Sequence, residues 1–301
     1  MPGMSDAHPD RDTLTRFLLE RSGVRGVVVH LDQTWLEIAG RTEYPLPVAA
    51  RLGETCAAAA LFTGHAKIDG RLSVQLRGTG ALRTLFAECT AAGTLRGIAH
   101  FDEPIPSPLT PRAFGPGSLL AITIESTPPG ASETTRYQGL VGLDADSLAA
   151  AFEGYFEQSE QLPTRVLLAS QRGRAAGIML QQLPGGHGDP DGWDRCNALF
   201  ETLGDEELAD QPVQTLLWRL FHEEGVQLLD RRALAFACSC SRERVGDMLR
   251  SLGQAEARET LVDGTAVVHC DFCGQEYRFE TEQIEALFSL APTAPGSDSL
   301  Q

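Results

Sequence analysis

The sequence lacks an excess of positive charge and any long apolar segment. Its 25 lysine and arginine residues are outnumbered by 41 aspartate and glutamate residues, which gives a formal net charge of -16 at pH 7. A chain of this charge has no general attraction to nucleic acid or to anionic membrane surfaces. The most apolar helix-like run, Val48 to Phe62, contains Arg51 and Glu54 and is too short to cross a bilayer. We therefore expect neither a nucleic-acid partner nor a membrane location.

The opening residues lack the pattern of a secretory signal. The start, MPGMSDAHPDRD, is polar and contains no apolar signal core. Seven cysteines in such a chain favour a reducing compartment, with free thiols or metal ligands in place of structural disulfides. We therefore expect a cytoplasmic protein.

A phosphate-binding loop is not evident either. The segment Gly78-Thr79-Gly80 lacks the third glycine and the following helix of a nucleotide-binding loop, so it is interpreted as a hairpin turn. No other pattern indicates a catalytic site, and we expect a protein that is not an enzyme. The 42% hydrophobic and 22% charged residues are those of an ordinary globular protein with a core.

The pattern of residues 1–183 predicts an α+β core domain with an antiparallel sheet. Short β-rich runs are separated by glycine-containing turns, which is typical of a meander. Pro45 and Pro47 suit the first turn of a longer helix. Strands are predicted at 16–19, 27–31, 72–76, 82–87, 95–101, 119–124, 137–141, 165–169 and 176–180, and helices at 33–39, 45–62 and 146–156.

A cluster of prolines and glycines at 184–190, which interrupts helices and strands, marks the start of a different segment. Residues 184–235 are predicted to form an acidic helical linker; over 181–237, 11 acidic residues are set against four arginines. Apolar residues recur at helical spacing, so these helices must pack an apolar stripe against another surface. The strongest stripe, a candidate for binding another apolar surface, consists of Leu216, Leu217, Leu220 and Phe221.

Residues 236–290 are predicted to form a small C-terminal domain, followed by a disordered tail at 291–301. Ser241 is placed to cap a helix reaching Leu252, and Thr281 to cap a last helix through residue 288. Two strands, 265–269 and 276–279, flank the second of two cysteine pairs. A unit of this size has little core of its own and needs a further source of stability.

The two cysteine pairs of this domain predict a zinc site. Cys238 and Cys240 form a C-x-C pair, and Cys270 and Cys273 form a C-x-x-C pair after the intervening residues 241–269. Four thiolates brought together from two short loops make the closed, soft, tetrahedral site that Zn²⁺ prefers. Since four sulfurs complete the tetrahedron, no position is open for catalysis, and the neighbouring His269 is the weaker candidate ligand.

Two other interpretations of the cysteines are weaker. A thioredoxin-like enzyme needs its C-x-x-C at the start of a helix, whereas Gly274 to Tyr277 leads into a predicted strand. A nucleic-acid-binding zinc module conflicts with the acidic charge. The remaining thiols are scattered: Cys56 and Cys89 fall in helical and strand-like patterns that predict buried, inert side chains, and the role of Cys196 is not indicated.

The close spacing of the pairs also permits a switch. Disulfides within each pair would close very small loops, and they would not join the two halves of the site. Oxidation of that kind would replace a long-range cross-link by two local ones, and the unit would loosen. The sequence favours this trigger over a permanent structural zinc site, which remains the alternative.

Several stretches resemble the 33 kDa redox-regulated heat-shock chaperones of bacteria and organelles. The similarity extends from about Arg16 to Phe288 and includes the four cysteines with the spacing of that family. It is carried by GRLSVQLRG at 70–78, LFAEC at 85–89, LRG at 95–97, YFEQSEQLPT at 155–164, LFHEE at 220–224, CSCSRERV at 238–245 and CDFCGQEYRF at 270–279.

The resemblance implies an ATP-independent holdase that binds unfolding proteins under oxidative stress. It implies one Zn²⁺ per chain, held by Cys238, Cys240, Cys270 and Cys273 in a reduced and inactive monomer. It also implies an active, oxidised homodimer with the disulfides Cys238–Cys240 and Cys270–Cys273. A constitutive protein-binding module with a permanent zinc cross-link is the alternative function.

Overall fold

The computed structural model describes residues 11–66, 68–127, 134–185 and 188–289. The chain forms two compact units, and each is described by itself. Their boundary in the sequence falls between Ala237 and Cys238. The predicted disorder of 291–301 concerns residues outside the described part. No described helix is long and apolar enough to span a membrane.

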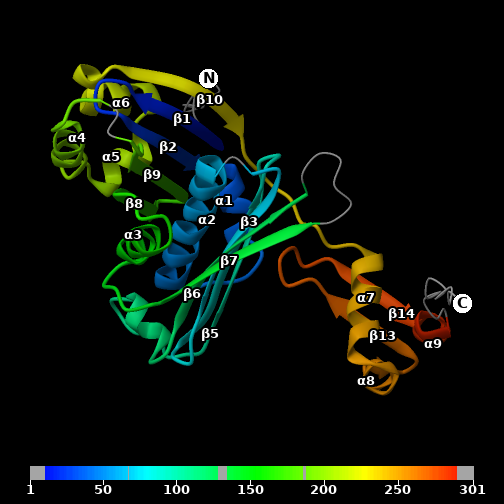
Figure 1. Cartoon of the computed structure of the whole chain (residues 1–301). Coiled ribbons are helices and arrows are strands. Elements are labelled where there is room, and N and C mark those ends of the chain that lie inside the picture. The colour runs from blue at the N-terminus through cyan, green and yellow to red at the C-terminus, as the bar shows by residue number, and fades with distance from the viewer. Residues whose placement is uncertain (1–10, 67, 128–133, 186–187, 290–301) are drawn as a thin grey trace, which may run out of the picture. The chain divides into compact units, whose positions relative to one another are not determined.

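The first unit contains a five-stranded antiparallel sheet (Figure 1). Its central strands are almost entirely apolar because both faces are covered. The strand order is β10 (Val226–Ala233), β1 (Thr13–Leu19), β2 (Val24–Leu31), β9 (Arg174–Gln182) and β8 (Thr164–Gln171).

A second sheet of six strands forms the other layer of this unit. Every neighbouring pair is antiparallel except β11 with β5, which are parallel. The order is β11 (Ala235–Phe236), β5 (Thr94–Phe101), β4 (Leu82–Thr90), β3 (Gly70–Arg77), β6 (Leu119–Ser126) and β7 (Thr135–Gly142).

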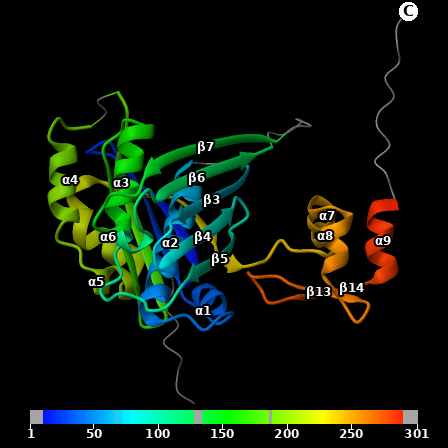
Figure 2. The ribbon, with the colours of Figure 1, turned by 90° about the horizontal axis from the view of Figure 1, so that it is seen from below.

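Helix α2 (Leu46–Ala66) lies between the two sheets and fills the main core (Figures 1 and 2). Its alanine run at 57–60 is fully buried, and these small side chains let strands from both sheets pack closely on the helix. Three further short elements complete the unit's larger core: α1 (Gln33–Ala39), η1 (Pro111–Phe114) and α3 (Leu148–Ser159). The α+β prediction with antiparallel sheets is confirmed.

Glu54 of α2 is a buried carboxyl group beside Arg51, with its nearest oxygen 2.8 Å from the guanidinium. Burial raises the pKa of Glu54 to about 7 in spite of Arg51. A folded pKa above the unfolded value of 4.5 means that the neutral form favours folding, and this contribution is lost as pH rises from about 4.5 to about 7.

Glu54→Gln removes the titration, so the variant is expected to gain stability relative to the parent as pH rises. The difference in unfolding free energy between the two proteins should change by about 2 kcal/mol in favour of Gln between pH 5 and pH 8. Urea unfolding at both pH values measures it, with Glu43→Gln at an exposed site as the control. If the difference in unfolding free energy between the two proteins does not change with pH, the raised pKa of Glu54 is contradicted.

The outer face of the five-stranded sheet is covered by the predicted linker. Its helices α4 (Gly192–Phe200), α5 (Asp205–Asp210) and α6 (Val213–Phe221), with the turn η2 (His222–Glu224), form a second apolar core with β1, β2, β8 and β9. The stripe Leu216, Leu217, Leu220 and Phe221 is buried there.

The prediction of a wholly helical segment over 184–235 is wrong at its end. Residues Val226–Ala233 form strand β10, which pairs with β1 from Thr13 to Leu19. The edge of β1 presents unpaired backbone groups, and hydrogen bonds to this edge outweigh the weak local helical pattern.

The second unit contains a three-stranded sheet, β12 (Leu261–Val262), β13 (Thr265–His269) and β14 (Glu276–Glu280), with helices α7 (Arg242–Leu252), α8 (Gln254–Glu259) and α9 (Thr281–Ser289). Ser241 caps α7 as predicted, since its hydroxyl accepts a hydrogen bond from the Arg244 amide at 3.2 Å. Thr281 was predicted to cap the last helix but is the first residue of α9, and its hydroxyl donates to the Gly264 carbonyl at 3.0 Å. The apolar core is small: Val245, Leu249, Ala257, Ala266, Phe279 and Ile284.

Candidate metal and redox centre

Two short loops of the second unit carry the cysteine pairs. Cys238 and Cys240 precede the capping Ser241 of α7, and Cys270 to Cys273 make the turn between β13 and β14. In this turn the carbonyl oxygen of Cys270 accepts from the amides of Cys273 at 3.3 Å and Gly274 at 2.7 Å. Gly274 has a φ of 70°, which glycine adopts without steric cost. The turn therefore directs both sulfurs to one side.

The four sulfurs converge on one point. They all lie within 4.8 Å of one another, and the contacts between the loops are Cys238 to Cys270 at 3.6 Å and Cys240 to Cys273 at 3.4 Å. A tetrahedral Zn²⁺ with Zn–S bonds near 2.3 Å separates its sulfurs by roughly 3.8 Å. The cluster therefore has the donor atoms and the size to hold one metal ion, and zinc fits it.

The pKa values of Cys240 and Cys273 shift in opposite directions. Burial raises the pKa of Cys240, but the Tyr277 hydroxyl, which donates to its sulfur at 3.1 Å, and the neighbouring thiols together lower it to about 7. Burial raises the pKa of Cys273 to about 12, and its interaction with Cys240 adds to the increase. Cys240 is therefore more easily held as a thiolate than Cys273. No pattern in the sequence distinguishes Tyr277 beyond its place in the strand after the cysteines.

His269 does not join this cluster. Its imidazole lies 3.2 Å from the carboxylate of Glu276 and is largely exposed. The C-x-x-C is followed by β14, so it lacks the helix start of a thioredoxin-like site. The other three cysteines, Cys56, Cys89 and Cys196, are buried in the first unit, and burial raises the pKa of each thiol.

A cluster of charges around Arg195 holds the linker in the first unit. Arg195 of α4 donates to both oxygens of Glu224, from Nε at 3.0 Å and from Nη2 at 2.9 Å. Glu224 is 3% exposed and also accepts from the hydroxyl of Ser22 in the β1–β2 turn. Asp189 and Asp191 complete the cluster, at 3.1 Å and 2.6 Å from Arg195.

These contacts were not evident from the sequence, because their partners are far apart along the chain and follow no periodicity. Arg195 lowers the pKa of Glu224, chiefly through the hydrogen bonds. The cluster joins α4, η2 and the β1–β2 turn, so it connects the two ends of the helical segment to the sheet that the segment covers.

Comparison with known proteins decides the family. The model of a family described as "Hsp33 protein" matches residues 12–280. The chain belongs to the Hsp33 family. A "33 kDa chaperonin" of Chromobacterium violaceum is 40% identical over 96% of this chain and 97% of its own length. Another, of Ectopseudomonas mendocina, is 43% identical over 93% and 96%.

The fold is also found in a solved structure. The crystal structure of a 33 kDa chaperonin, a heat shock protein 33 homolog from Thermotoga maritima, matches with a TM-score of 0.78 and 21% sequence identity, covering 92% of this chain and 98% of that one. The resemblance noted in the sequence is thereby confirmed at the level of the Hsp33 family and its fold.

Proposed function

We propose that this chain is a redox-regulated, ATP-independent chaperone that binds partly unfolded proteins under oxidative stress. The observation that carries the proposal is the convergence of four sulfurs within 4.8 Å in a unit with a small apolar core. Membership of the Hsp33 family supports it, as do relatives that bear the name chaperonin. In this proposal the reduced form binds one Zn²⁺ and is inactive.

In the reduced state the four cysteines would cross-link the two loops of the second unit. A bound zinc ion would hold the sulfurs as thiolates and contribute about 10–16 kcal/mol to the folding of such a unit. Six buried apolar residues alone offer little to replace this contribution. The folded second unit therefore depends on its cysteines remaining reduced.

Oxidation would join sulfurs within each pair, as Cys238–Cys240 and Cys270–Cys273. A thiolate attacks one peroxide oxygen to give a sulfenic acid and release hydroxide; the neighbouring cysteine then attacks that sulfur, the S–S bond forms and a second hydroxide or water leaves. Each disulfide consumes one peroxide, which accepts the two electrons that the two cysteines lose. Because each bond closes a very small loop, the two halves of the site are no longer joined.

Loss of the cross-link would activate the chain through the linker, residues 184–235. We infer that it releases the apolar stripe Leu216, Leu217, Leu220 and Phe221 and uncovers the sheet face beneath. A large apolar surface of this kind binds unfolded proteins. The formal charge of -16 would keep the opened form soluble, and homodimer formation would cover part of the surface. The proposal places the protein in the cytoplasm, where thiol reductants would reverse the change.

Peroxide titration tests the proposal. The accessible thiol count in denaturant is expected to fall from seven to three per chain, since four of the seven cysteines pair, while one zinc per chain appears in solution. Suppression of the heat aggregation of a model client should increase in parallel. If zinc stays bound and aggregation is unchanged, the chain is instead a constitutive protein-binding module with a permanent zinc cross-link.

A further inference from the structure

The face of the five-stranded sheet that the linker covers is apolar at its centre. Strands β1, β2, β8 and β9 share the second apolar core with helices α4, α5 and α6, which lie over them (Figure 1). The large side chains of this sheet face are fully buried beneath the linker: Phe17, Leu19, Val24, Val28, Ile178 and Leu180. Release of the linker would therefore uncover one apolar surface on neighbouring strands.

Arginines flank this sheet face at both ends of its strands. By the strand register, Arg21 of the β1–β2 turn and Arg165 near the start of β8 lie at one end. Arg172 of the β8–β9 turn and Arg174 of β9 lie at the other. The seven steps from Arg165 to Arg172 correspond to roughly 23 Å of extended chain. The uncovered face would thus lie between two pairs of guanidinium groups.

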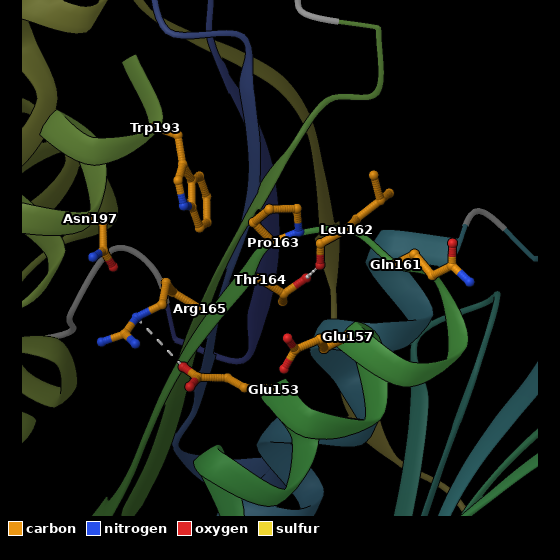
Figure 3. Close-up of a pocket in the computed structure, with 9 residues that line it drawn as sticks. All are labelled: Glu153, Glu157, Gln161, Leu162, Pro163, Thr164, Arg165, Trp193 and Asn197. Atoms are coloured by element: carbon orange, nitrogen blue, oxygen red, sulfur yellow. Dashed lines mark hydrogen bonds and ion pairs between the residues drawn. The ribbon is translucent and has the colours of Figure 1, made fainter. Parts of the chain in front are cut away.

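The linker supplies a carboxylate to each arginine at the first end. Arg21 lies 3.1 Å from Asp189, and Arg165 lies 3.4 Å from Glu201. Arg165 also lies 3.7 Å from Glu153 of α3, toward which its side chain points in Figure 3. Release of the linker would remove Asp189 and Glu201 and leave Arg165 with Glu153.

The same arrangement is found at the second end. Arg172 lies 2.7 Å from Glu206 and 3.5 Å from Asp210, both on α5. Arg174 lies 2.9 Å from Asp210 and 3.3 Å from Asp32, which belongs to the first unit outside the linker. The docked linker is therefore a segment whose apolar stripe packs on the sheet face and whose carboxylates pair with the arginines at its ends.

We propose that the oxidised chain binds, on this sheet face, apolar segments of partly unfolded proteins that are flanked by acidic residues. The docked linker defines the chemistry that the face accepts, because a client segment must replace both its apolar contacts and its carboxylates. A basic or uncharged segment would cover the arginines without pairing them, which costs free energy. The inference rests on the proposed function, since only release of the linker uncovers the face.

The released linker would favour clients of the opposite charge. Over residues 181–237 it has 11 acidic residues against four arginines, and the whole chain has a net charge of -16. Both charges attract a basic segment. A preference for acidic segments therefore identifies the sheet face as the binding surface, whereas a preference for basic segments identifies the linker stripe.

Three capped, fluorescein-labelled peptides test the charge preference. Each has seven alternating leucine and serine residues, with two glutamates, two glutamines or two lysines at both ends. Fluorescence anisotropy with the peroxide-oxidised full-length chain measures Kd at about 0.15 M salt, which screens charges beyond about 8 Å. The glutamate peptide is expected to bind about fivefold more tightly than the glutamine peptide, and the lysine peptide more weakly than either. Equal Kd values, or tightest binding of the lysine peptide, would overturn the proposal.

The double variant Arg21→Gln/Arg172→Gln locates the preference. It removes one guanidinium group from each end, whereas Arg165 and Arg174 keep an acidic partner in the first unit. The oxidised variant should bind the glutamate and glutamine peptides with Kd values that differ by less than about twofold. A parental preference in this variant would refute the location.

The matched control is Arg77→Gln/Arg136→Gln, which removes the same charge from exposed positions of the six-stranded sheet and should keep the fivefold preference. Client protection by the oxidised parent chain is measured separately by light scattering. Protection together with equal affinity for the three peptides would refute this inference and leave the chaperone proposal intact. Loss of both protection and peptide binding would refute the chaperone proposal and this inference with it.

Discussion

Cys270→Ser is expected to abolish stoichiometric zinc binding and to unfold the second unit without any oxidant. Serine replaces a thiolate by a hydroxyl that is a poor ligand for zinc, and the other three sulfurs cannot complete the tetrahedron. The loss of most of about 10–16 kcal/mol exceeds what a small apolar core can offset. Amide exchange in β13 and β14 should then approach the rate of an unfolded chain.

The matched control is Cys196→Ser, which changes a buried thiol in the first unit. This variant should retain one zinc per chain and slow exchange in the second unit. Zinc is measured with a chromophoric chelator after thiol modification, and exchange by mass spectrometry. A folded second unit in zinc-free Cys270→Ser would show that the unit does not depend on the metal. Loss of zinc on oxidation would then not unfold the unit, and the proposed redox switch would be refuted.

Glu224→Gln is expected to loosen the linker while the four cysteines keep their metal. The substitution preserves shape but removes the buried negative charge that Arg195 and Ser22 contact. Disrupting a buried ion pair costs about 3–5 kcal/mol, and the lower value applies here because Asp189 and Asp191 still pair with Arg195. About 3 kcal/mol corresponds to roughly a hundredfold increase in local opening of α4.

Amide exchange over residues 192–224 and limited proteolysis measure this opening, and client protection by the reduced variant should rise with it. Glu223→Gln alters the neighbouring, exposed carboxylate and serves as the control. An unchanged exchange rate in Glu224→Gln would contradict a role for the Arg195 cluster in docking. Faster exchange without client protection would show instead that the linker does not cover the client-binding surface.

The α+β class, most strands and helices, and the four-cysteine set could be predicted because each depends on local information. A C-x-C or C-x-x-C spacing brings two sulfurs to one loop, and alternating or helical apolar periodicity marks the faces that must be buried. The apolar stripe at 216–221 was recognised for the same reason, although its partner, the outer face of the five-stranded sheet, could not be named. Strand β10 was missed because pairing with β1, not its own pattern, determines its conformation.

The sequence by itself therefore determined which side chains can bind a metal and which segments must pack, since short spacing and periodicity are properties of the chain alone. Tertiary structure alone decided that sulfurs from two loops meet within 4.8 Å and that Glu224 contacts Arg195. These features depend on contacts between residues that are far apart in the sequence. Such residues become neighbours only when sheets and helices bury their apolar faces together.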